Sequence, residues 1–96
     1  MRPSDILSKH RDAVLAIAVR HGVDNVRVFG SIVRGEDTDT SDVDLLVDPS
    51  DKTSLMDLAG IEIEAEDLTG LVFDVCTPNS LSPRFRDHIV KTARKL

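Results

Sequence analysis

Two aspartates that could take part in chemistry, Asp42 and Asp44, are separated by one residue in a segment where they alternate with Val43 and Leu45. Successive side chains on a strand point to opposite faces, so the two carboxylates share one face and the apolar residues share the other. Neighbouring carboxylates repel each other unless a cation lies between them. Hard oxygen ligands at this spacing suit Mg²⁺, so the spacing predicts a strand that presents a metal-binding pair.

A Gly-Ser pair precedes these aspartates. Gly30-Ser31, a gap of ten residues and Asp42-x-Asp44 resemble the motif of nucleotidyltransferases related to DNA polymerase β. Asp74 falls where the third carboxylate of that family falls. The short length and the segment 77–83 resemble the minimal nucleotidyltransferase branch, whose members are antitoxins of HEPN-domain ribonuclease toxins. The resemblance covers nearly the whole chain and implies one domain, residues 1–96, with a polymerase β-like nucleotidyltransferase fold.

The resemblance also implies roles for the three carboxylates. Nucleotidyl transfer is an in-line attack on the α-phosphorus of a nucleoside triphosphate, and two metal ions about 3.5–4 Å apart can hold the attacking and leaving oxygens. Asp42 and Asp44 are expected to bridge two Mg²⁺ ions. Asp74 is expected to complete one site and to help deprotonate the incoming hydroxyl. These three residues are therefore both the predicted catalytic residues and the predicted metal ligands.

Three further residues are the predicted nucleotide-binding residues. Gly30 lets the phosphates of ATP approach without a Cβ in the way. Ser31 is expected to contact these phosphates through its hydroxyl and the N–H groups at the start of a short helix. Arg34 is either an extra phosphate contact or a surface arginine paired with Glu36 or Asp37. The acidic side chains of the loop 36–39 are otherwise expected to be solvated.

The bulk composition limits the classes of partner. The formal net charge is −5 and the only aromatic residues are three Phe. This disfavours direct nucleic-acid binding, which relies on basic residues and stacking platforms. A single cysteine, Cys76, and the absence of a long apolar run or leader predict a cytoplasmic protein without a membrane segment. So small a domain has a thin core, and we expect a hetero-oligomer with the toxin. The histidines, among them His21, are expected at surfaces or helix ends.

Apolar periodicity and turn residues indicate the elements that position these side chains. The expected helices cover residues 5–20, 31–34, 53–69 and, from Ser82-Pro83, the chain to Leu96. The expected strands cover residues 26–29, 42–47 and 71–76. The alternation in Ile61–Glu64 also permits a strand, but the surrounding residues favour the helix. The predicted fold class is α/β (α+β), a small mixed sheet with helices packed on one face and the carboxylates on the open face.

The function implied by this resemblance is an antitoxin that transfers AMP from ATP to a tyrosine of its toxin. One alternative is an antitoxin that neutralises the toxin by binding alone, for which the apolar face of the last helix offers a surface. Another is a small-molecule nucleotidyltransferase of the aminoglycoside type. Those enzymes carry an added helical domain that these 96 residues do not contain.

Overall fold

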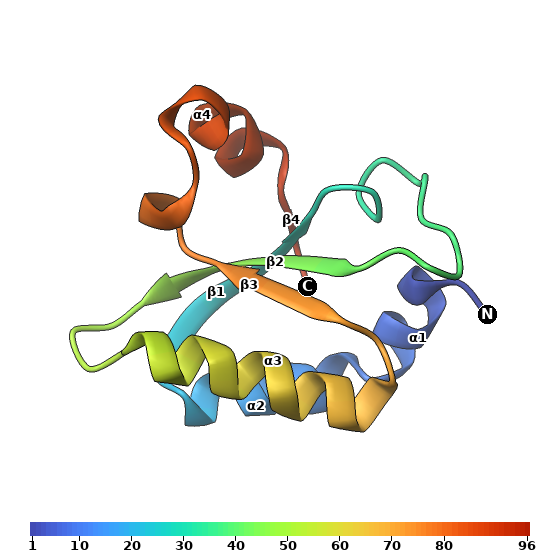
Figure 1. Ribbon diagram of the computed structural model, residues 1–96, viewed down its shortest axis with the longest axis horizontal. Coiled ribbons are helices and arrows are strands. Elements are labelled where there is room, and N and C mark those ends of the chain that lie inside the picture. Colours follow the sequence, from blue (N-terminus) through green and yellow to red (C-terminus); the bar gives the residue numbers. More distant parts are fainter.

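The loop that carries the Gly-Ser pair joins two adjacent strands. The computed structural model describes all 96 residues. In chain order the elements are α1 (Pro3–Lys9), α2 (Arg11–Arg20), β1 (Val23–Phe29), β2 (Val43–Pro49), α3 (Leu55–Thr69), β3 (Phe73–Cys76), the 3₁₀ turn η1 (Pro78–Ser80), α4 (Pro83–Thr92) and β4 (Arg94–Lys95) (Figure 1). None of the helices has the length and apolar character needed to cross a membrane.

The four strands form one mixed sheet in the order β3-β2-β1-β4. β1 pairs antiparallel with β2 and β4, whereas β2 pairs parallel with β3. Parallel neighbours need a long crossover, and α3 provides it between β2 and β3. The predicted mixed sheet is therefore confirmed, and β2, which carries Asp44, lies inside it rather than at an edge.

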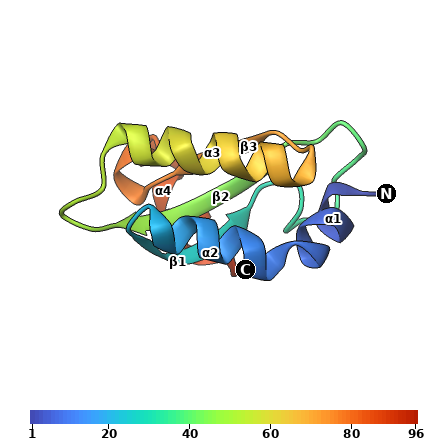
Figure 2. The ribbon, with the colours of Figure 1, turned by 90° about the horizontal axis from the view of Figure 1, so that it is seen from below.

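The hydrophobic core lies between one face of the sheet and the helices α2 and α3, which run side by side across it (Figure 2). Val43, Leu45 and Val47 of β2 are fully buried in this core, as is Ile61 of α3. The predicted alternation is thus confirmed for these residues, but Leu46, on the same face as Asp44, is also fully buried, so the predicted open face is covered at this position. Because Val43, Leu45 and Val47 face the core, Asp44 between them faces the opposite side of the sheet.

The helix predicted over residues 53–69 is present as α3, but it begins two residues later, at Leu55, and both of its ends have clear signals. Ser54 Oγ accepts a hydrogen bond from Asp57 N at 3.3 Å, and Asp57 Oδ2 accepts one from Ser54 N at 2.9 Å. This reciprocal pair is a capping box. At the other end Gly70 takes the left-handed conformation, with φ +76°, that stops a helix.

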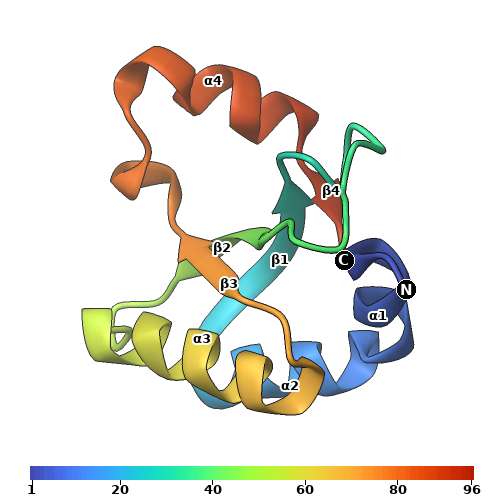
Figure 3. The same cartoon turned by 45° about the vertical axis from the view of Figure 1, so that its right-hand side comes forward.

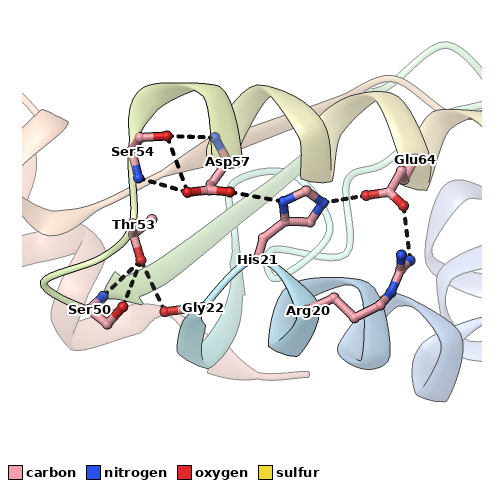
Figure 4. A network of polar contacts seen from close by, with 8 residues as sticks. All are labelled: Arg20, His21, Gly22, Ser50, Thr53, Ser54, Asp57 and Glu64. Carbon is pink, nitrogen blue, oxygen red and sulfur yellow. Dashed lines mark hydrogen bonds and ion pairs between the residues drawn. The ribbon is translucent and has the colours of Figure 1, made fainter.

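His21, at the C-terminal end of α2, ties this helix to α3 (Figure 4). Its Nε2 makes a short hydrogen bond with Glu64 Oε2, and its Nδ1 lies 3.3 Å from Asp57 Oδ1. Arg20 Nη2 lies 2.9 Å from Glu64 Oε1. The hydrogen bond with Glu64, aided by Asp57, raises the pKa of His21 above its usual 6.5. The predicted helix-end role of His21 is confirmed, and we call this group the His21 clamp.

Gly60 gives the His21 ring its space. Within a helix, glycine is about 1 kcal/mol less favourable than alanine. A Cβ at Gly60 would stand 2.6 Å from His21 Cε1, closer than two such atoms can approach. The glycine in the middle of α3 is therefore explained by the clamp rather than by the helix.

A side chain of α3 also reaches the outer strand of the sheet. β3 is an edge strand, and Val75 N donates a 2.8 Å hydrogen bond to Glu62 Oε2. Burying a backbone N–H without a partner is unfavourable, and Glu62 satisfies this one at the edge. The contact fixes β3, and with it Asp74, to the crossover helix.

The last helix differs most from its prediction. α4 ends at Thr92, Ala93 is extended, and Arg94 and Lys95 form β4 on the open edge of β1. Leu96 N then donates a 3.0 Å hydrogen bond to Val26 O. α4 lies on the opposite side of the sheet from α2 and α3 and buries none of its residues (Figures 1 and 3). The expected packing on one face thus holds for α2 and α3 but not for α4.

The first helix and all three predicted strands also have different bounds from those predicted, and β2 covers Val43–Pro49 rather than residues 42–47. The single helix expected over residues 5–20 is broken at His10, whose φ of −106° and ψ of 14° leave the helical range. The break lets α1 turn and bury Pro3 and Leu7. β1 begins at Val23 with an irregular register after Asp24, and β3 begins only at Phe73.

Candidate active site

The structure gathers the three predicted carboxylates beside one another. Asp44 on β2 is the direct register partner of Asp74 on β3, and neighbouring strands lie about 4.8 Å apart. Asp42 immediately precedes β2 and is close enough for its charge to act on Asp44. We call Asp42, Asp44 and Asp74 the carboxylate cluster.

Asp44 is the most enclosed member of the cluster. Its side chain is partly buried, whereas Asp42 and Asp74 are exposed. Burial, followed by the charges of Asp74 and Asp42, raises the pKa of Asp44, and the charge of Arg34 opposes this shift. A carboxylate that is destabilised by two like charges is stabilised when a cation joins them. The electrostatics of the cluster therefore favour a bound cation.

Gly30 stands directly against this cluster. Phe29 pairs with Asp44 across β1 and β2, and Gly30 follows with a φ of +78°, which glycine adopts without a steric penalty. A Cβ at this position would collide with Asp44 Oδ2 and would lie 3.3 Å from Asp44 Cγ. Both the backbone conformation and the neighbouring carboxylate thus require glycine here.

Residues 31–34 form a series of turns and not the predicted short helix. Arg34 N donates to Gly30 O at 3.3 Å, and Glu36 N donates to Ser31 O at 2.9 Å. Gly30 and Gly35 both have left-handed conformations, so the helical backbone cannot extend in either direction. So few residues also cannot offset the cost of nucleating a helix. The expected helix start for anion binding is therefore absent, and only the hydroxyl and turn amides near Ser31 remain for phosphate.

Arg34 is found in the second of the two situations expected for it, a surface arginine paired with Glu36. Its side chain is 59 % exposed, and its Nε lies 3.4 Å from Glu36 Oε2. Its charge also acts on Asp44, where it partly opposes the rise in the pKa of that carboxyl group. A long, exposed arginine in a weak surface pair can exchange that partner for a phosphate at little cost. The contact between Arg34 and phosphate stays a prediction.

The donor set of the cluster fits Mg²⁺. This ion typically takes one or two carboxylates and completes its shell with water and substrate phosphates. No three His, Cys, Asp or Glu side chains converge closely enough to hold a metal ion by themselves. Asp42, Asp44 and Asp74 are the carboxylates that could hold the ion if phosphate oxygens and water completed its shell.

Cys76 lies two residues beyond Asp74 on β3 and is partly buried. Burial, then the charges of Asp74 and Asp44, raises the pKa of its thiol to about 11. The thiol therefore stays protonated at neutral pH and does not compete as a nucleophile.

One member of the acidic loop is not solvated as expected. The Asp37 side chain is fully buried, and it pairs with Arg2 at 2.5 Å. The neighbouring Glu36 and Asp39 are exposed, as predicted. The partners of Asp37 lie more than thirty residues away in sequence, so no local pattern could have revealed its burial.

Comparisons with known proteins agree with this geometry. A family model described as "Polymerase beta, Nucleotidyltransferase" matches residues 13–96. The chain belongs to this nucleotidyltransferase family. The matched range includes the carboxylate cluster and the Gly-Ser loop, so the resemblance read from the motif is confirmed.

Two relatives of this nucleotidyltransferase have similar lengths. A "putative protein adenylyltransferase" of Methanocaldococcus jannaschii is 39% identical over 80 residues, which are 83% of this chain and 86% of the relative. The protein adenylyltransferase MntA of Thermococcus cleftensis is 41% identical over 76 residues, which are 79% and 74% of the two chains.

Solved structures share the architecture of this nucleotidyltransferase. A "putative minimal nucleotidyltransferase" superposes with a TM-score of 0.86 at 39% identity, covering 97% of this chain and 95% of the other. A toxin–antitoxin structure with AMP-PNP has a TM-score of 0.74 at 15% identity, covering 88% and 69%. The second likeness shows a shared fold.

Proposed function

We propose that this nucleotidyltransferase is a Mg²⁺-dependent protein adenylyltransferase. It transfers AMP from ATP to a tyrosine hydroxyl of a HEPN-domain ribonuclease toxin and thereby neutralises the toxin. The observation that carries the proposal is the direct pairing of Asp44 with Asp74 beside Gly30. The names of the two relatives support a protein as the acceptor rather than a small molecule.

The residues of the cluster have separate tasks in this reaction. The hydroxyl oxygen of the acceptor attacks the α-phosphorus of ATP, the bond from that phosphorus to the β-phosphate oxygen breaks, and diphosphate leaves. The hydroxyl proton needs an acceptor, because an un-ionised tyrosine is a poor nucleophile at neutral pH. Asp74 is the candidate base, since it is exposed at the edge of the sheet.

Binding and alignment of the nucleotide fall to the other site residues. Mg²⁺, when bound by the cluster, supplies positive charge that neutralises the phosphates and the charge developing on them. Gly30 leaves the space beside Asp44 free of side-chain atoms. Ser31, the next residue, would contribute its hydroxyl to phosphate binding. Arg34 would add a positive charge on the same loop. These groups orient the α-phosphorus for in-line attack.

The partner of this reaction is a folded protein, so the proposed assembly is a hetero-oligomer of nucleotidyltransferase and toxin. Since ATP and a ribonuclease toxin both act in the cytoplasm, we place the reaction there. Neutralisation by binding alone is the second candidate function. It is favoured by α4, which buries no residue and leaves Phe85 and Val90 exposed.

The deciding experiment is the intact mass of the toxin that co-purifies with wild-type protein and with an Asp42→Asn/Asp44→Asn double variant. A control variant, Asp39→Asn/Asp51→Asn, makes the same change in charge at exposed positions outside the cluster. We expect toxin heavier by AMP units with wild type and with the control, and unmodified toxin with the double variant. Unmodified toxin held tightly by all three proteins would instead support binding alone.

A further inference from the structure

One carboxylate of the site loop lies in the protein interior. The loop between β1 and β2 carries Gly30, Ser31 and Arg34 and ends at Asp42. All residues from Arg34 to Thr40 are exposed except Asp37, whose side chain has no accessible surface. A buried charge needs partners, and those of Asp37 lie outside the loop.

The partners of Asp37 come from the start of α1. Asp37 Oδ2 accepts a 2.9 Å hydrogen bond from Ser4 N, and Asp37 Oδ1 accepts a 2.5 Å charged hydrogen bond from Arg2 Nη2. The same guanidinium donates to two loop carbonyls, from Nε to Asp37 O at 3.2 Å and from Nη2 to Gly35 O at 3.1 Å. Four hydrogen bonds, three from Arg2 and one from Ser4, thus join this loop to the start of α1.

This arrangement also completes α1. The residue before the helix, Arg2, makes no side-chain cap of its own, so the free N–H of Ser4 depends on Asp37. Burial pushes the pKa of Asp37 upward, but the hydrogen bonds from Ser4 and Arg2 outweigh burial and hold the pKa below its usual range. The carboxylate is therefore charged at neutral pH, and its contacts are at full strength there.

We propose that Asp37 is a positioning residue of the nucleotide site: by fixing the loop 31–42 to the start of α1, it sets where Ser31, Arg34 and Asp42 stand relative to Asp44 and Asp74. Asp44 and Asp74 are held by the strands themselves, whereas the other half of the site lies on the loop 31–42. Ile32 and Val33 pack this loop against the core near its start, and the polar segment that follows depends on Asp37. Alignment of the two halves at ångström level decides rates in such chemistry. This inference rests on the proposed function, because it assigns Asp37 to nucleotide binding.

The structure offers a closely matched control. Asp57 also caps a helix through a backbone N–H, that of Ser54, and also contacts a basic side chain, that of His21. It belongs to α3 and does not touch the site loop. Asp37→Asn and Asp57→Asn each remove a carboxylate that accepts a backbone N–H at the start of a helix, although Asp37 is fully buried and the Asp57 side chain is 33 % exposed. Only the first variant releases the loop. Arg2→Gln, which keeps the contact between Asp37 and Ser4, is a milder second variant.

The test measures three quantities on wild type and the three variants, at a temperature where each is folded. These are the Kd for the Mg²⁺ complex of AMP-PNP, the KM and kcat with ATP and the toxin, and the hydrogen-exchange rates of amides 31–42. For Asp37→Asn we expect the Kd and KM to rise about tenfold and exchange in the loop to quicken about tenfold. Arg2→Gln should change the same quantities in the same direction by less, and Asp57→Asn should change none of them.

Two results would overturn the inference. In the first, Asp37→Asn and Arg2→Gln show the same Kd, KM and loop exchange rates as Asp57→Asn. Asp37 would then act only as a helix cap. The other is quickened exchange spread over the whole chain rather than confined to residues 31–42. Wild-type protein that fails to bind the nucleotide would refute the proposed function instead, and the exchange rates would still decide whether Asp37 anchors the loop.

Discussion

Two glycines of the site loop allow the contact between Gly30 and Asp44 to be tested with an internal control. Gly30 and Gly35 have similar positive φ angles, +78° and +69°. A Cβ at Gly30 would collide with the Asp44 carboxylate, whereas a Cβ at Gly35 would have no atom within 4 Å. Gly30→Ala and Gly35→Ala therefore share the backbone strain, and only Gly30→Ala displaces Asp44.

The expected magnitudes follow from these two effects. A left-handed conformation costs an L-residue about 1–2 kcal/mol, so each variant should lose that much stability. For a domain of this size the loss corresponds to a fall in Tm of roughly 4–16 °C. In Gly30→Ala the carboxylate must also move, and a displacement of about 1 Å can cost a factor of roughly 10² in rate. Gly35→Ala should keep the activity of the wild type.

The assay is the rate of AMP transfer to the toxin at saturating Mg²⁺ and ATP, measured well below the Tm of both variants. Thermal unfolding of the same samples reports the shared loss of stability. Equal activities for the two variants would refute the reasoning, because they would mean that the position of Asp44 does not depend on the space left by Gly30.

Three further predictions concern stability. The hydrogen bond with Glu64 raises the pKa of His21 in the folded protein. The stabilisation of the folded state by protonated His21 is therefore complete below about pH 6.5 and is lost as the pH rises through the higher folded pKa. The Tm measured from pH 6 to 9 should consequently fall more in wild type than in His21→Gln. Gly60→Ala should lower the Tm of wild type but raise it in a His21→Ala background, where the ring no longer blocks the favourable helix residue. Asp44→Asn should raise the Tm without metal, because it relieves the repulsion of Asp44 by Asp42 and Asp74. Added Mg²⁺ should raise the Tm of the wild type only. An equal rise in Tm for both proteins would exclude Asp44 as a ligand.

Elements with a strong local signal could be predicted from the sequence. Acidic and apolar residues alternate from Asp42 to Leu45 at the start of β2, and α3 has a capping box and a terminal glycine. The break at His10 could not be predicted, because the residues around it suit a helix. The strand β4 could not be predicted either, because residues 93–96 would continue α4 if β1 did not offer an open edge. In both cases tertiary contacts outweigh a weak local preference.

The candidate site likewise has parts that the sequence predicted and one part that it could not predict. The spacing of the Gly-Ser pair and the aspartates predicted which residues would meet, and the strand register places Asp44 against Asp74 as that motif implies. The roles assigned to these residues stay predictions. The burial of Asp37 could not be predicted, because its neighbours in the loop are polar and its partners, Arg2 and Ser4, are distant in sequence.

The hydrogen bond from Val75 N to Glu62 has a consequence for how copies of this protein meet one another. An exposed edge strand is a template on which a strand of another chain can add, and proteins commonly block it with charge. A strand arriving at β3 would find this donor occupied and would face the Glu62 carboxylate. Sheet-to-sheet self-association through this edge is thereby disfavoured, which leaves Asp74 accessible to an acceptor side chain.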